Sequence, residues 1–169
     1  MAVLTAGAAF SEKVYGLPLD EPFDIVIASC GGEPKDICLY QAQKGLNLAS
    51  QCAAEGGKIL LLAACSQGVG DDNYQQYVRQ FASPVEQMLE FEHKGFRMGA
   101  HKAFLFSRTL TRFEVVVDSD MDAETLAECH LRKGDAQTTV DGWIRAAAKP
   151  PRIAVVPNAN TTYFYRAAR

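Results

Sequence analysis

Residues 23–45 read FDIVIASCGGEPKDICLYQAQKG, and this stretch decides the fold. Phe23 to Ser29 is a short apolar, β-branched run bounded by proline and glycine, a pattern that predicts a buried parallel strand. After the glycine turn, apolar residues recur at helical spacing from Asp36 to Glu55, until Gly56-Gly57 ends the run. The stretch therefore predicts a strand, a glycine turn and a helix of about five turns.

The rest of the chain continues this alternation of strands and helices. Lys58 to Cys65 is an apolar run that predicts a second parallel strand, which completes a βαβ unit. Further along, the spacing predicts helices over 72–81, 84–91, 100–110, 122–129 and 139–148, and strands over 113–117 and 152–156. This alternation predicts an α/β fold: a doubly wound, Rossmann-like three-layer sandwich around a mostly parallel sheet.

The chain of 169 residues has the length of one domain, and its 48% of apolar residues can build a sizeable core. Residues 1–22 hold two prolines and two glycines without a sustained period, and we interpret them as a lead-in segment before a domain that spans 23–169. The end of the chain, residues 158–169, leaves two alternatives open: an added edge strand or a docked tail.

Charge and hydropathy exclude two classes of partner. The net charge is −3 and the 17 basic residues are spread along the chain, so we expect no patch for nucleic acid or for an anionic membrane. The longest apolar run, Ile59 to Cys65, is far shorter than the roughly 20 residues that span a bilayer. Met1 to Phe10 lacks the basic start of a signal peptide, which favours the cytoplasm.

The five cysteines are odd in number and include no Cys-x-x-Cys pair, so we interpret them as free thiols. Cys30 and Cys65 each end a predicted strand, where a redox or nucleophilic role is an alternative to packing. Burial in the core is the favoured interpretation. No residues have the spacing of a metal site, and no nucleophile with its base is singled out.

Ligands of open α/β sheets bind beyond the carboxyl ends of the strands, which directs attention to residues 31–35 and 66–72. Gly32, Gly68 and Gly70 would let the backbone approach a ligand, and the amides of the following helices would favour an anion. Glycines that only make βα turns are an equally good interpretation. Neither loop matches a dinucleotide or P-loop fingerprint.

Tyr40, Gln41 and Lys44 form the most informative cluster, because residues i and i+4 of a helix share a face. Lysine supplies charge, tyrosine a hydroxyl donor and glutamine an amide, a set that suits the carboxylate of a small hydroxy or keto acid. Spacing alone favours a simpler interpretation, an ordinary half-exposed helix face. His101 and Lys102, near the start of a later helix, are further acid/base or anion-binding candidates.

The order of these residues resembles a known family, the C-terminal domain of nickel-pincer-nucleotide lactate racemases. The resemblance is carried by Asp24-Ile-Val-Ile-Ala-Ser29, by Gly31-Gly32-x-Pro34-x-Asp36 and by Leu39-Tyr40-Gln41-Ala42-x-Lys44-Gly45. It continues through 57–62, the Cys65-x-x-Gly68-x-Gly70 loop, Ser83-Pro84, 99–110 and 115–117, and so spans most of the chain.

This resemblance implies half of a two-domain isomerase that racemises or epimerises a 2-hydroxy acid by hydride transfer to a covalently held nickel pincer nucleotide. In that family the cofactor lysine, the nickel-ligating histidine and the acid/base histidines belong to an N-terminal domain that this sequence does not contain. The resemblance therefore implies no catalytic or metal-binding residue in this chain and no cofactor bound to it alone. It also implies that the chain is inactive without the partner domain.

What the resemblance carries over is the substrate-side wall of the cleft between the two domains. Tyr40, Gln41 and Lys44 match the family's tyrosine, glutamine and lysine that face the substrate. The glycines of the two cleft loops, which would let the domains close, are Gly31, Gly32, Gly68 and Gly70. His101 stands where lactate-using members have a tryptophan, which implies a different, larger or more polar 2-hydroxy acid.

Two other functions stay open from the residues alone. A free-standing α/β module could use Tyr40, Gln41 and Lys44 to hold a small anion or a partner protein without catalysis. A nucleotide-dependent oxidoreductase is weakly indicated by Gly68-Val69-Gly70.

Overall fold

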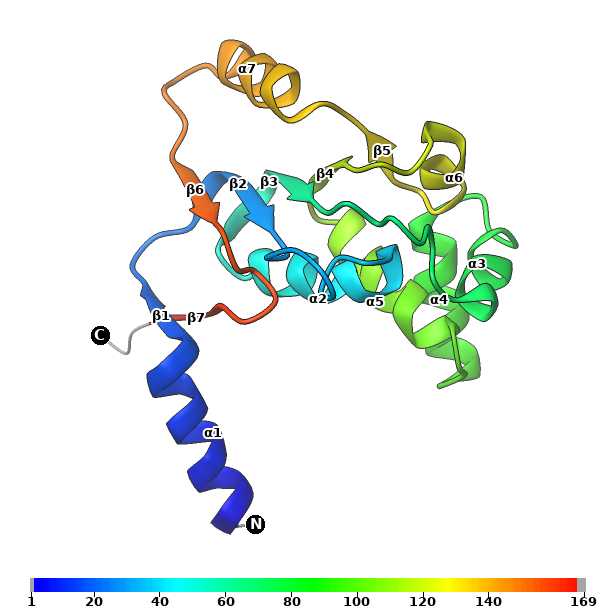
Figure 1. The fold of residues 1–169 in the computed structure, drawn as a ribbon, viewed down its shortest axis with the longest axis horizontal. Coiled ribbons are helices and arrows are strands. Elements are labelled where there is room, and N and C mark those ends of the chain that lie inside the picture. The colour runs from blue at the N-terminus through cyan, green and yellow to red at the C-terminus, as the bar shows by residue number, and fades with distance from the viewer. Residues whose placement is uncertain (1, 167–169) are drawn as a thin grey trace.

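The computed structural model describes residues 2–166, whose centre is one sheet of five parallel strands (Figure 1). The strand order is β5, β4, β3, β2, β6, and every neighbouring pair is parallel. In that order the strands span Arg132–Lys133, Glu114–Asp118, Ala53–Leu62, Phe23–Ser29 and Ile153–Val156. The predicted α/β class and parallel sheet are confirmed.

Helices cover both faces of this sheet (Figure 1). One face carries α2 (Leu39–Ala49), α3 (Asp72–Val78), α4 (Pro84–Lys94) and α5 (Ala100–Leu110), and the other carries α7 (Ala136–Ala146). The short α6 (Ala123–Glu128) lies beside β5. No helix within residues 2–166 has both the length and the apolar character needed to cross a membrane.

The two faces of the sheet bury very different amounts of apolar surface. The larger core lies between the sheet and α2 to α5, and its side chains of lowest exposure include Leu39, Leu46, Tyr74 and Phe106. The smaller core, on the α7 side, comprises Ile25, Leu60, Val116 and Trp143. Because the stabilisation by burial scales with the apolar area removed from water, the α2 to α5 face contributes most of it.

Short polar residues start the helices of the thicker layer. The Asp71 carboxylate accepts a first-turn amide of α3, and the Ser83 hydroxyl accepts a first-turn amide of α4. Pro84 follows Ser83 at the first position of α4, as the sequence predicts. The residue before α2 is Cys38, whose side chain caps no amide. The start of α2 therefore depends on other partners.

The helix after the glycine turn is shorter than predicted. The sequence pattern runs from Asp36 to Glu55, whereas α2 covers Leu39–Ala49. Residues 53–57 instead open β3, where Ala53 pairs with Phe23 of β2. Ala53 pairs with β2 and the Gly56 amide donates to the Arg112 carbonyl oxygen, so tertiary contacts override the local helical pattern here. The two-residue strand β5 was not predicted either, because two residues show no period.

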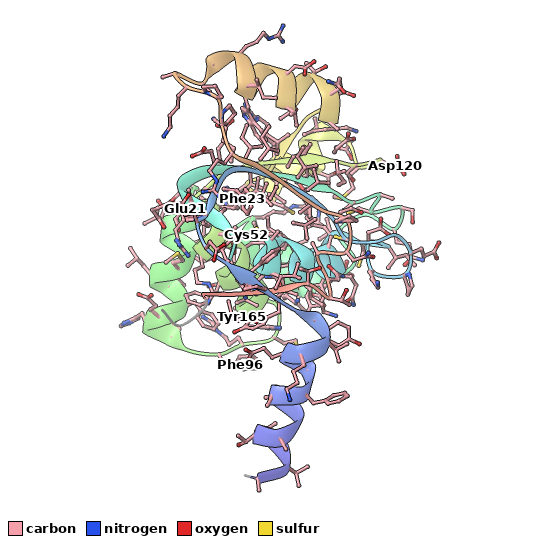
Figure 2. All side chains as sticks on the ribbon, turned by 90° about the vertical axis from the view of Figure 1, so that its left-hand side faces the viewer. Glu21, Phe23, Cys52, Phe96, Asp120 and Tyr165 are labelled. Carbon is pink, nitrogen blue, oxygen red and sulfur yellow. The ribbon has the colours of Figure 1, made fainter. Side chains whose placement is uncertain are left out.

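The lead-in residues contain regular structure that the sequence pattern did not predict. Ala2–Tyr15 form α1, and Gly16–Leu19 form β1, which pairs in parallel with β7 (Tyr163–Arg166) in a separate two-stranded sheet. None of the α1 residues is buried, and the helix extends away from the body of the molecule (Figure 2). The tail thus contributes a strand, but this strand joins β1 and not an edge of the main sheet.

The contribution of the α7 layer to stability can be tested at Trp143. Its indole is buried and donates Nε1–H to Oε1 of Glu114 at 3.0 Å. Trp143→Ala should lower the free energy of unfolding by about 3–5 kcal/mol because it empties the smaller core, whereas Trp143→Phe should lower it by about 1–2 kcal/mol because most apolar contact remains. Urea denaturation followed by far-UV circular dichroism measures both losses. Equal losses would contradict a dependence on apolar burial.

Candidate functional site

The candidate site lies at the edge of the sheet where the parallel strands end. Residues 30–38 follow β2, residues 63–71 follow β3, and Asp120 marks the same edge after β4 (Figure 2). Glu21 and Phe23 mark the opposite edge, where β2 begins (Figure 2). Strand β2 has β3 on one side and β6 on the other, so the strand order reverses at β2. Open α/β sheets bind ligands at such a reversal.

The loops after β2 and β3 are joined by backbone hydrogen bonds that fix the start of α2. The Leu39 amide donates to the Gly68 carbonyl oxygen at 2.9 Å, and the Tyr40 amide donates to the Val69 carbonyl oxygen at 3.0 Å. These first-turn amides of α2 are therefore already bound. The expectation that they receive an anion is wrong for this helix, and its side chains are left as the groups that can bind a ligand.

Tyr40 stands at the centre of the candidate cluster, half-buried in the first turn of α2. Its hydroxyl lies 3.5 Å from Nε2 of His101, which lies in the first turn of α5, and the two rings meet edge to face. The Tyr40 ring also meets Tyr74 edge to face. Burial, and then the Asp71 carboxylate, raise the pKa of the Tyr40 hydroxyl, so this group stays protonated near neutral pH.

Lys44 presents an exposed charge on the same helix. Its Nζ donates to Oε1 of Gln41 at 2.7 Å, about one helical turn away. Across residues 2–166, Lys44 forms no ion pair with a carboxylate. The pair therefore offers an ammonium group that is held in place but not neutralised.

A second lysine contacts Tyr40 from α5. Lys102 is only 7% exposed, its Nζ lies 4.8 Å from the centroid of the Tyr40 ring, and it donates to Oε1 of Gln43 at 2.9 Å. Burial, and then repulsion from Lys44, lower the pKa of the Lys102 ammonium. The sequence marked Lys102 as an anion-binding candidate but showed neither its burial nor its partner Gln43, which lies 59 residues away in the chain.

The structure thus brings the predicted substrate-side residues into two contacting pairs at the starts of α2 and α5. Tyr40 meets His101, and Gln41 meets Lys44. Lys102, which touches Tyr40 and is repelled by Lys44, connects the pairs. That these side chains bind a substrate stays a prediction.

The glycines predicted to line the cleft lie in the same two loops. Gly31 and Gly32 are in the loop after β2, and Gly68 and Gly70 are in the loop after β3. The backbone φ is +67° at Gly68 and +81° at Gly70, a left-handed conformation that favours glycine. A Cβ at Gly70 would lie 2.3 Å from the Cys38 sulfur, whereas nothing lies within 4 Å of one at Gly68. Their proposed part in domain closure stays a prediction.

All five cysteines are free and buried, as the favoured interpretation of the sequence predicts. Burial is the main reason that the pKa of Cys30 is raised to about 12 and that of Cys65 to about 11. Neither thiol is therefore a thiolate nucleophile near neutral pH. In the described part of the chain, histidine, cysteine, aspartate and glutamate side chains do not gather in a group of three that could hold a metal ion.

Comparison with known proteins connects this geometry to one family. A family model described as the lactate racemase C-terminal domain matches residues 19–161. The chain is 26% identical to a lactate racemase of Lactiplantibacillus plantarum over 159 residues, which are 90% of this chain and 37% of that protein. It is 32% identical to a lactate racemase of Thermoanaerobacterium thermosaccharolyticum over 75 residues, 44% of this chain and 18% of that protein. The chain spans less than half the length of these curated relatives.

Two solved structures share the fold. The lactate racemase apoprotein from Thermoanaerobacterium thermosaccharolyticum superposes with a TM-score of 0.87 at 22% identity, over 95% of this chain and 40% of that one. A protein from Thermotoga maritima superposes with a TM-score of 0.62 at 15% identity, over 94% of this chain and 40% of that one. Both likenesses show that the α/β architecture recurs within longer proteins.

Gly68 and Gly70 form a matched pair for testing the loop after β3. Alanine at either position has to adopt a left-handed backbone, but only at Gly70 would it also collide with Cys38. Gly68→Ala should lower the free energy of unfolding by about 1 kcal/mol, and Gly70→Ala by about 3 kcal/mol or more. Urea denaturation measures both. Similar, small losses would mean that the loop can move away from Cys38 at little cost.

Proposed function

This chain belongs to the family of lactate racemase C-terminal domains, and we propose that it forms the substrate-side wall of an enzyme that racemises or epimerises a 2-hydroxy acid. The observation that carries the proposal is the exposed Lys44 ammonium, which is held by Gln41 on α2, the helix whose first turn contains Tyr40. Within residues 2–166 no carboxylate neutralises it. The carboxylate of a substrate would complete this arrangement.

Each polar side chain of the wall has one task in the proposed site. Lys44 attracts the substrate carboxylate, and Gln41 holds the ammonium while its own NH₂ group can donate to the substrate. Tyr40 contributes a protonated hydroxyl that can donate to a second substrate oxygen. Three directed contacts fix a small molecule against rotation, and such orientation lowers the entropic part of a reaction barrier.

In the proposed site, His101 sets the direction of the Tyr40 hydroxyl. Its Nδ1 lies 3.4 Å from the Arg97 carbonyl oxygen, and a proton placed on Nδ1 leaves Nε2 to accept from Tyr40. The contact between Nε2 and the hydroxyl is long at 3.5 Å, so a substrate oxygen can replace it. A polar ring at this point favours a 2-hydroxy acid whose substituent is larger or more polar than the methyl group of lactate.

The donor groups of this wall fit a carboxylate and not a nickel ion. Ammonium, hydroxyl and amide groups donate hydrogen bonds, whereas nickel in proteins takes imidazole, thiolate or carboxylate ligands. We therefore assign the nickel pincer nucleotide, which supplies the hydride acceptor in the proposed reaction, to a separate N-terminal domain. This chain contributes no catalytic residue in the proposal, and alone it is inactive.

The loops after β2 and β3 lie next to the wall, where the proposed N-terminal domain would close over the substrate. Gly31 is pressed against the loop after β6, because a Cβ added to it would lie 2.7 Å from Oδ1 of Asn158. Gly32, one residue on, has open space around it. In the proposal, Gly32 and Gly68, where a Cβ would meet nothing within 4 Å, keep this edge free of side chains for the partner domain. Gly31 and Gly70 shape the two loops by leaving room for Asn158 and Cys38.

Lys44→Ala in the complete enzyme that carries this domain should lower kcat/KM for the 2-hydroxy acid about 10- to 100-fold, because a hydrogen bond to a charged group contributes roughly 1.5–3 kcal/mol. Chiral chromatography of the two stereoisomers measures the rate, and circular dichroism checks the fold. Lys149→Ala is the matched control, since Lys149 is an exposed lysine between α7 and β6, at the other end of the sheet. Unchanged turnover in Lys44→Ala would remove Lys44 from the site.

Activity and binding measurements on the isolated chain distinguish the proposed function from its alternatives. We expect no interconversion of 2-hydroxy acids by this chain alone, because the proposal assigns it no catalytic residue. Titration calorimetry with a nicotinamide nucleotide should show no tight binding, and tight binding would favour an oxidoreductase. Strong binding of a hydroxy acid that does not increase when the partner domain is added would favour a free-standing binding module.

A further inference from the structure

Lys102 is a buried cation whose partners do not neutralise it. Its side chain is 7% exposed, yet the atoms that meet its ammonium are an amide oxygen of Gln43 and the ring face of Tyr40. Within residues 2–166 it forms no ion pair with a carboxylate. Buried charges are usually paired because removing them from water is costly.

Gln43 adds a second unfavourable feature at the same place. It is 2% exposed, and while its oxygen accepts from Lys102, its Nε2 is buried without a hydrogen-bond partner in the described structure. Apolar side chains of similar volume would pack α2 against α5 without either cost. Features that break a local rule tend to lie at functional sites, and this one adjoins Tyr40.

The first turn of α5 holds Tyr40 at two points. His101 meets its hydroxyl, and Lys102, the next residue, meets its ring face. Two consecutive side chains of one helix thus constrain both the polar end and the aromatic body of a residue on another helix. A cation over the ring face is attracted by the negative face of the aromatic system, so loss of the charge alone weakens this hold.

We propose that Lys102 is a positioning residue of the substrate-side wall: its buried ammonium, oriented by Gln43, holds the Tyr40 ring in place and adds a second positive charge behind Lys44 for an anionic substrate. This inference rests on the proposed function for its substrate. The hold on Tyr40 and the coupling to Lys44 are properties of this chain alone.

The titratable groups around Lys102 and Tyr40 come from three segments. Lys44 on α2 repels Lys102, the Cys38 thiol lies in the loop after β2, and Asp71, in the loop after β3, acts on Tyr40. Repulsion between Lys44 and Lys102 is relieved when a carboxylate reaches them. The two ammonium groups therefore bind an anion more strongly together than Lys44 would alone.

Nuclear magnetic resonance of this chain tests the inference without partner domain, cofactor or substrate, so its failure is distinguishable from failure of the proposed function. The first readout is the Tyr40 ring, in protein with labelled tyrosine, assigned by Tyr40→Phe. Its signals should shift in Lys102→Met, which keeps the stem and loses the charge, and should move back towards their original positions in Lys102→Arg, which restores the charge. Unmoved Tyr40 signals in Lys102→Met would overturn the positioning role.

The second readout is the titration of Lys102 through its ε-carbon signal, assigned by its loss in Lys102→Arg. Lys44→Met removes the repelling charge and should raise the Lys102 midpoint by about half a pH unit, a threefold change in proton affinity. Lys149→Met, the matched control, should leave it in place. An unchanged midpoint in Lys44→Met would overturn the coupling of the two charges. If Lys102→Met does not fold, the Tyr40 signals are read in Lys102→Gln, which also removes the charge, and unmoved signals there would overturn the positioning role.

Discussion

Two backbone hydrogen bonds, from Leu39 to Gly68 and from Tyr40 to Val69, hold the first turn of α2 against the loop after β3. The candidate site depends on this contact, because the start of α2 sets the position of Tyr40 and, about one turn later, of Lys44. Each bond contributes only about 1 kcal/mol net, but leaving either group buried and unpaired would cost about 1–3 kcal/mol. The loop therefore fixes where α2 begins, a task that side-chain caps perform for α3 and α4.

The thicker helical layer makes this geometry rigid. Helices α2 and α5 pack against each other through the larger core, in which Ala42, Leu46, Ala103 and Phe106 are buried. Side chains on their outer faces inherit that rigidity, so the contact of Tyr40 with the start of α5 joins two well-packed elements. Binding groups supported by packed helices are positioned more accurately than groups on free loops. The thin α7 layer covers the other face of the sheet, away from the wall (Figure 1).

Much of this fold could be predicted from the sequence, because strands β2 and β4 and helices α4 and α5 carry their signals locally, as Ser83-Pro84 does at the start of α4. The switch of residues 53–55 from helix to strand could not, since it depends on tertiary contacts such as the pairing of Ala53 with Phe23 of β2. In the site, spacing placed Tyr40 and Lys44 on one face, but only family resemblance favoured a binding role over an ordinary surface. The contact of Tyr40 with His101 joins residues 61 apart, and no local pattern contains it.

Glutamine, and not glutamate, orients both lysines of the wall. Elsewhere Lys58 and Lys94 pair with the carboxylates of Glu114 and Glu90. By contrast, Lys44 and Lys102 each donate to an amide oxygen, of Gln41 and Gln43 respectively. A glutamate would orient each lysine equally well but would also neutralise it, and an anionic ligand would then have to displace that carboxylate. An amide orients the ammonium and leaves its charge available. In the proposed function, the paired use of glutamine leaves both charges available to an anion from outside this chain.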